Sequence, residues 1–80
     1  MHYRNGREAH NGDKIICLDN FKVGVLRDAT AGNDYCNGYI QIGLEPSASD
    51  PIACMCDCLH VHDMLAILEE KGLDKRPSGM

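Results

Sequence analysis

The hydrophobic residues of this chain come in short runs, and in the runs at 21–27 and 35–42 apolar and polar positions alternate. A period of two places successive side chains on opposite faces of an extended strand, so this alternation predicts β-structure. It is clearest where Phe21, Val23 and Val25 share one predicted face. Gly24, inside the same run, indicates a bulge or a sharp bend. Five runs are expected as strands: residues 15–18, 21–27, 35–42, 52–56 and 59–61.

A single helix is predicted over residues 63–71. Asp63 is its expected N-cap, because a carboxylate can accept the free backbone N–H groups of the first turn. Gly72 is expected to end the helix in a left-handed conformation, with Leu73 folding back onto the last turn. Three apolar residues at helical spacing form one stripe that we expect to pack into the core: Met64, Ile67 and Leu68.

Four to five short strands followed by one helix indicate a mostly-β domain. Closing a small sheet into a barrel removes its exposed edges, so we expect a small barrel with the helix covering one open end. The connections at 29–34 and 43–51 are expected as exposed loops. We place the single domain at residues 1–73 and a flexible tail at 74–80.

Composition limits the classes of protein to consider. Hydrophobic residues make up 44 % of the 80 positions, which argues against intrinsic disorder, and the length allows one domain. The 12 acidic and 8 basic residues give a net charge of −4, which disfavours nucleic-acid binding because that depends on neutralising phosphates. No apolar run is long enough to span a membrane, and the first residues lack the apolar stretch of a secretory signal. Five cysteines cannot all pair within one chain, which favours a reducing cytoplasm with free or metal-bound thiols.

The first half of the chain carries a resemblance to a known family. Tyr-Arg-Asn-Gly-Arg-Glu-Ala at 3–9 is followed by Gly12-Asp13 and then by the strand at 21–27 with its Gly24-Val25 pair. This order resembles the opening of Src-homology-3-like barrels of the KOW type. Over roughly residues 3 to 68, the fuller pattern is similar to small uncharacterised proteins of tailed bacteriophages, through the segments 3–9, 34–38 and 58–60.

The resemblance implies a small Src-homology-3-like barrel and a phage-type accessory or anti-defence protein in the cytoplasm of a bacterial host. Such a protein would bind and inhibit a host protein rather than catalyse a reaction. KOW-type barrels bind RNA or protein through exposed loops, and the acidic charge of this chain leaves protein as the expected partner. We expect the contact surface at the loops 3–7, 28–37 and 44–50.

One segment has the composition of a metal site. Thiols and imidazoles occupy every second position from 54 to 62, namely Cys54, Cys56, Cys58, His60 and His62. On a straight strand they would share one face at spacings of ~6.5–7 Å, whereas Zn²⁺ needs four ligands at ~2.0–2.3 Å. A bend, or Cys17 or Cys36 from another strand, is therefore needed. We favour the alternative in which these cysteines fill the core and no cofactor is bound, because the chain does not contain the two Cys-x₂₋₄-Cys pairs that are usual in zinc sites.

Catalysis is not expected. Cys58 and His60 have the residue types of a nucleophile and its base, and Asp57 or Asp63 has the charge to orient the imidazole. No glycine-rich segment lies nearby to supply oxyanion donors, so the set of groups that acyl transfer requires is incomplete.

A nucleotide or another small molecule is the alternative ligand. Tyrosines can stack on a base while arginines bind phosphate. Because aromatic residues make up only 5 % of the chain, we favour the interpretation in which the tyrosines simply cover the surface of the barrel. A protein that binds such a ligand could be a homo-oligomer with pockets between its subunits. The third hypothesis is a domain stabilised by zinc. The candidate binding residues are Tyr3, Arg4, Arg7, Arg27, Tyr35, Asn37 and Tyr39.

Overall fold

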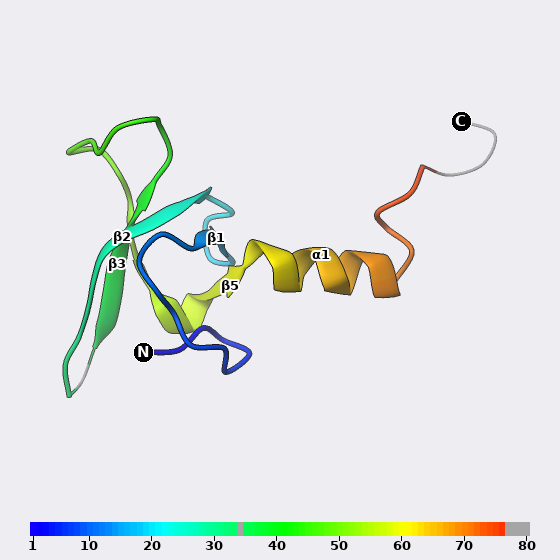
Figure 1. Cartoon of the computed structure of the whole chain (residues 1–80), viewed down its shortest axis with the longest axis horizontal. Coiled ribbons are helices and arrows are strands. Elements are labelled where there is room, and N and C mark those ends of the chain that lie inside the picture. The colour runs from blue at the N-terminus through cyan, green and yellow to red at the C-terminus, as the bar shows by residue number, and fades with distance from the viewer. Residues whose placement is uncertain (34, 77–80) are drawn as a thin grey trace.

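The computed structural model describes residues 1–33 and 35–76, which form one antiparallel sheet and one α-helix (Figure 1). The mostly-β class predicted from the alternating runs is confirmed. A 3₁₀ turn, η1 (Met55–Asp57), separates the last two strands. The helix, α1 (Val61–Glu70), follows the last strand directly. The strands are β1 (Lys14–Cys17), β2 (Val23–Ala31), β3 (Cys36–Gln41), β4 (Ile52–Cys54) and β5 (Cys58–His60).

The sheet is open, so the closed barrel expected from the sequence is not observed. Its strand order is β4-β3-β2-β1-β5, which places β4 and β5 at opposite edges. Both edge strands contain three residues, and they follow one another in the sequence with only η1 between them. No ladder between β4 and β5 closes the sheet within the described residues. Because only η1 links the two edges, the sheet must curve strongly.

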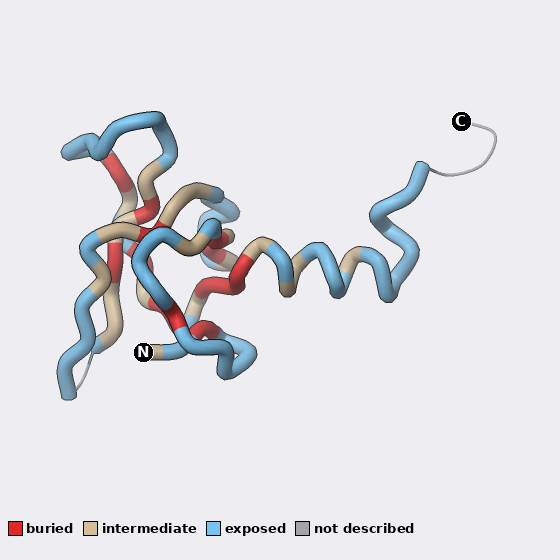
Figure 2. Tube along the Cα trace, in the orientation of Figure 1, coloured by how far each residue is buried: buried red, intermediate tan, exposed pale blue. Residues whose placement is uncertain are grey.

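One face of the sheet carries the core. Leu26 of β2 pairs with Ile40 of β3, and Cys17 of β1 pairs with Cys58 of β5, and all four are almost fully buried. Tyr3 of the N-terminal segment belongs to the same core cluster. Figure 2 shows that the buried positions gather at the sheet and the adjoining segments, whereas the helix is mostly exposed. Burying an apolar side chain of this size contributes about 1.5–3 kcal/mol. The rest of the core consists of Ala9, Ile15, Ala53 and Met55.

The opposite face is only partly covered. Val23 and Ile52 lie on it and are 48 % and 61 % exposed. The alternation at 21–27 therefore marks the outer face, and the buried residue of this strand is Leu26 on the other side. Phe21 lies before β2 with a positive φ of 57° and is exposed, so it does not extend the strand as expected.

Strand β2 is longer than expected and contains its irregularity at a different residue. It continues to Ala31 through residues that were predicted as a loop. The register shifts between Arg27 and Thr30, where Asp28 has a φ of 50°. Gly24 marks a close approach instead, because a Cβ there would overlap the carbonyl oxygen of Gln41 on β3.

The helix begins two residues earlier than predicted, and Asp63 is not its N-cap. His60 has this role: its backbone is extended, and its Nδ1 accepts the backbone N–H of His62 at 3.0 Å. The predicted end is confirmed. Gly72 has a φ of 71°, and the N–H groups of Gly72 and Leu73 donate to the carbonyl oxygens of Glu69 and Leu68, as in a Schellman motif.

Helix α1 projects away from the sheet and does not cover an open end (Figure 1). None of its residues is buried, so the stripe predicted to pack into the core remains outside it. The radius of gyration is 14.0 Å, against about 12 Å for a compact chain of this length. Within the described ranges, no helix is long and apolar enough to cross a membrane. Residues 74–76 are exposed, and positions 77–80 of the predicted flexible tail lie outside the described residues.

Candidate functional site

The α1 stripe is an apolar surface that the rest of the described chain does not cover. We use this name for Met64, Leu65, Ile67 and Leu68, which at 100° per residue span an arc of about 160° on one side of the helix. Leu65 and Ile67 are 46 % and 39 % exposed, and Met64 and Leu68 are half-buried. An arc this wide is typical of a helix that packs against a partner surface.

The base of α1 is anchored while the remainder extends from the domain. Asp63 in the first turn accepts a hydrogen bond from Asn5 Nδ2 at 3.0 Å and forms an ion pair with Arg7 Nη1 at 3.0 Å. The Asn5 hydrogen bond and the positive charge of Arg7 lower the pKa of Asp63. The main contacts of the helix with the sheet are with β5 and β1. These contacts fix the direction in which the α1 stripe is presented.

The carboxylates of α1 lie at both of its ends. Glu69 and Glu70 lie in its last turn, and no basic residue lies there. The carboxyl end of a helix carries a partial negative charge, so two carboxylates at this end are unfavourable. Lys71, the C-cap residue, supplies one positive charge at this end, and a surface with further basic residues would relieve the remaining repulsion.

The five metal candidates predicted from the sequence are divided among three places. The Sγ atoms of Cys54 and Cys56 lie 3.0 Å apart, and a carboxylate oxygen of Asp57 is within 4.8 Å of both. Cys58 lies in the core, where desolvation by burial raises the pKa of its thiol to about 12. Among the described residues, no group with metal-ligand spacing includes Cys58, His60 or His62. The structure therefore contains a possible metal-binding cluster smaller than the predicted set.

His60 belongs to a buried polar network that the sequence did not reveal. Its Nε2 lies 3.9 Å from Asp13 Oδ1, and Tyr3 donates its hydroxyl proton to Asp13 Oδ2 at 2.6 Å. Desolvation by burial and this hydrogen bond raise the pKa of Tyr3 well above its usual value. Burial alone would raise the pKa of Asp13, but the hydrogen bonds from Tyr3 and from the His10 backbone lower it. Tyr3 is thus a core residue, and its hydroxyl is already engaged.

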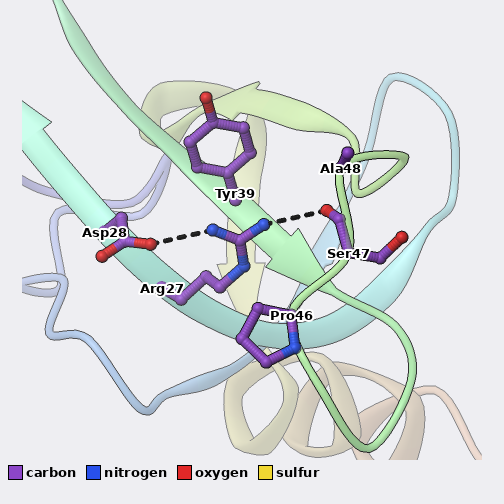
Figure 3. A pocket seen from close by; sticks show the side chains of 6 residues that line it. All are labelled: Arg27, Asp28, Tyr39, Pro46, Ser47 and Ala48. Carbon is purple, nitrogen blue, oxygen red and sulfur yellow. Dashed lines mark hydrogen bonds and ion pairs between the residues drawn. The ribbon is translucent and has the colours of Figure 1, made fainter.

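Arg27, the candidate for binding phosphate, is held within the protein (Figure 3). It lines an open hollow of about 640 Å³ together with Asp28, Tyr39 and Ser47. Its guanidinium carbon lies 4.4 Å from the centre of the Tyr39 ring. Its nitrogen atoms donate four hydrogen bonds, to Asp28, to the Ser47 carbonyl oxygen and twice to Asp50. Two carboxylates therefore already balance its charge.

The structure does not bring the seven predicted binding residues together. Arg4 contacts the Asp57 carboxylate and the Cys56 carbonyl oxygen, away from the hollow at Arg27. Tyr35 is exposed next to Gly32 at the end of the β2–β3 hairpin. Asn37 pairs with Cys54 across the β3–β4 ladder, and Tyr3, Arg7 and Tyr39 have the separate roles described above.

Comparison with known proteins does not identify a relative. No protein-family model, no curated protein and no solved structure matches this chain. The function is therefore inferred from the geometry of the described residues.

Proposed function

We propose that this chain is a non-catalytic protein-binding module and that α1 is its docking element. The observation that carries this proposal is a helix anchored at one end whose apolar arc contains no buried residue. An amphipathic helix that inserts its apolar face into a groove is a recurring mode of protein recognition. The docking surface thus lies on the helix rather than on the loops expected from the sequence.

The proposed partner presents an apolar groove with basic residues at one end. The groove would take up the α1 stripe, and its basic residues would lie beside Glu69 and Glu70. The resemblance to phage proteins makes a bacterial host protein the partner, inhibited by occupation of its groove. The strongly curved sheet fits the Src-homology-3-like scaffold of the same hypothesis.

Two side chains of α1 should dominate the binding energy. Leu65 and Ile67 are the most exposed residues of the α1 stripe. Fully burying such a side chain contributes about 1.5–3 kcal/mol, and each 1.4 kcal/mol corresponds to about a tenfold change in affinity. Truncating either one should therefore weaken binding by roughly tenfold or more.

The nucleotide alternative has less support. A phosphate group at Arg27 would have to compete with Asp28 and Asp50 for the guanidinium. Tyr3 and Tyr39 belong to separate surroundings, one in the core and one over Arg27. One base therefore cannot stack on both of these tyrosines at once.

The test compares variants within the same helix. Leu65→Glu and Ile67→Glu place a charge in the α1 stripe, and Ala66→Glu places the same charge on the exposed polar side. A photo-crosslinker at position 65 in bacterial lysate should capture a protein, and capture should be lost in Ile67→Glu but retained in Ala66→Glu. Circular dichroism checks that all variants fold.

Three results would contradict the proposal. Capture that is equal in Ile67→Glu and Ala66→Glu would show that the α1 stripe is not the docking surface. A dimer in native mass spectrometry that Leu65→Glu dissociates would identify a second copy as the occupant. A rise in melting temperature with a nucleotide, lost in Arg27→Lys, would favour the small-molecule hypothesis.

A further inference from the structure

We infer that Cys36, Cys54 and Cys56 form a binding site for a thiophilic metal ion, with Zn²⁺ as the expected occupant. The three thiols come from β3, from the end of β4 and from η1. Residues 36 and 54 are 18 positions apart, so the fold rather than sequence proximity brings them together.

The local backbone explains why the thiols converge. On a straight strand, Cys54 and Cys56 would point to the same side about 6.5–7 Å apart. Strand β4 ends at Cys54 and the 3₁₀ turn begins at Met55, which shortens the distance between the two Sγ atoms to 3.0 Å. Strand β3 adds Cys36, whose Sγ lies 3.7 Å from that of Cys54. The bend and the second segment that a metal site requires are both present.

One of the sulfur–sulfur distances already matches a tetrahedral thiolate site, whereas Cys36 does not yet share one ligand-spaced group with Cys56 and Asp57. With Zn–S bonds of ~2.3 Å, two sulfur ligands of a tetrahedron are ~3.8 Å apart. Cys36 and Cys54 already have this separation, at 3.7 Å. The Sγ atom of Cys56, 3.0 Å from that of Cys54, must move away from it by about 0.8 Å and approach Cys36, which rotation of an exposed side chain allows.

Asp57 supplies a fourth ligand. One of its carboxylate oxygens lies within 4.8 Å of the Sγ atoms of both Cys54 and Cys56. Arg4 Nη2 lies 3.0 Å from Asp57 Oδ1, and Arg4 Nε donates to the Cys56 carbonyl oxygen at 3.0 Å. Arg4 therefore orients the carboxylate and adds a positive charge beside a site with several anionic ligands.

The thiols are accessible to an ion from solvent. Cys56 is exposed, and Cys36, Cys54 and Cys56 line an open hollow of about 440 Å³ with Tyr35 at its side. Cys58, in contrast, is fully buried and donates its S–H to the Cys54 carbonyl oxygen at 3.4 Å. Solvent accessibility thus distinguishes the three proposed ligands from the buried thiol of Cys58.

The experiment titrates the reduced, metal-free protein with Co²⁺ and then with Zn²⁺. Co²⁺ bound by several thiolates in a tetrahedron gives a charge-transfer band in the near ultraviolet and d–d bands in the visible. We expect both bands to saturate at one ion per chain and to disappear when Zn²⁺ displaces Co²⁺. Zn²⁺ should also raise the melting temperature, because it binds the folded state.

Single variants identify the ligands. Cys36→Ser, Cys54→Ser and Cys56→Ser should each weaken Zn²⁺ binding by more than about 100-fold, beyond the 10–100-fold that loss of an outer partner causes. His62→Ala is the matched control, because it removes an exposed ligand type outside the cluster and should leave the affinity unchanged. Circular dichroism of the metal-free variants checks that they fold.

The three-thiolate site is wrong if no thiolate-to-cobalt band forms under reducing conditions. It is also wrong if Cys36→Ser binds Zn²⁺ as tightly as the wild type. Loss of binding in His62→Ala with full binding in Cys36→Ser would instead support the ligand set expected from the sequence alone.

Discussion

Two nitrogen atoms of Arg27 donate to the same carboxylate oxygen of Asp50, at 3.1 and 3.0 Å, and so connect strand β2 to the loop 43–51. Lysine keeps the charge but lacks the planar fork that makes both contacts. We expect Arg27→Lys to lower the melting temperature and to increase the rate of limited proteolysis in this loop by several-fold. Arg76→Lys, at an exposed position, is the control, and an equal cleavage rate in both variants would contradict a clamping role.

Gly24 and Gly43 differ in the space around them, and this predicts opposite effects of alanine. A Cβ at position 24 would overlap the backbone oxygen of Gln41, whereas at position 43 its nearest neighbour would be 3.9 Å away. We expect Gly24→Ala to destabilise the fold by about 1–3 kcal/mol. Gly43→Ala should leave stability unchanged or raise it by about 0.4–1 kcal/mol. Urea unfolding measures both, and equal midpoints would show that β2 and β3 do not approach as closely as described.

Asp63 predicts how stability responds to acid. The Asn5 hydrogen bond and Arg7 hold the pKa of this carboxyl below its usual 3.8, so the folded state prefers it ionised. Its contribution is present above the unfolded pKa and is lost as the pH falls through the lower folded value. The melting temperature should therefore fall below about pH 4, and Asp63→Asn should fall less steeply than the wild type. Asp74→Asn, an exposed carboxylate, should keep the full slope, and identical slopes in all three proteins would exclude this linkage.

Cys58 predicts a loss of stability at alkaline pH. Burial raises the pKa of its thiol from 9.0 to about 12, so the unfolded chain loses this proton first. The contribution is complete below pH 9 and is lost as the pH rises toward 12. In Cys58→Ala, we expect a lower melting temperature at neutral pH and a weaker decline over this interval. Cys56→Ala, studied with chelator present, should keep the wild-type decline because this cysteine is exposed; the reverse order of the two variants would contradict the assignment.

The features predicted correctly from the sequence are those that local geometry determines. Alternation located β2 and β3, because a period of two reflects the strand itself, and short runs bounded by turn residues located the other three strands. The helix end at Gly72 was also predictable, since a left-handed residue there depends on a glycine at that position.

The errors concern features set by contacts between distant segments. The N-cap is His60 at the end of β5, whose ring accepts the His62 N–H, while Asp63 lies in the first turn and binds Asn5 and Arg7 from a distant segment. The predicted metal segment was divided because a 3₁₀ turn begins at Met55, and no sequence signal distinguished this turn from a continuing strand. The helical spacing of the α1 stripe and the presence of Cys36 can both be read from the sequence. Where the stripe and this thiol lie relative to the sheet depends on the whole fold.

The contacts of residues 3–9 have a consequence for how the chain acquires its structure. Arg4 and Arg7 bind partners 53 and 56 residues later, and Tyr3 completes the core from the same segment. During synthesis at ~5–20 residues per second, this segment waits about 3–10 s for Asp57 and Asp63 to follow. Until then, the hairpins can form, but residues 3–9 cannot yet pack against their apolar face. The segment that is synthesised first is therefore among the last to adopt its native contacts. The fold of this domain is therefore completed only after synthesis has passed Asp63.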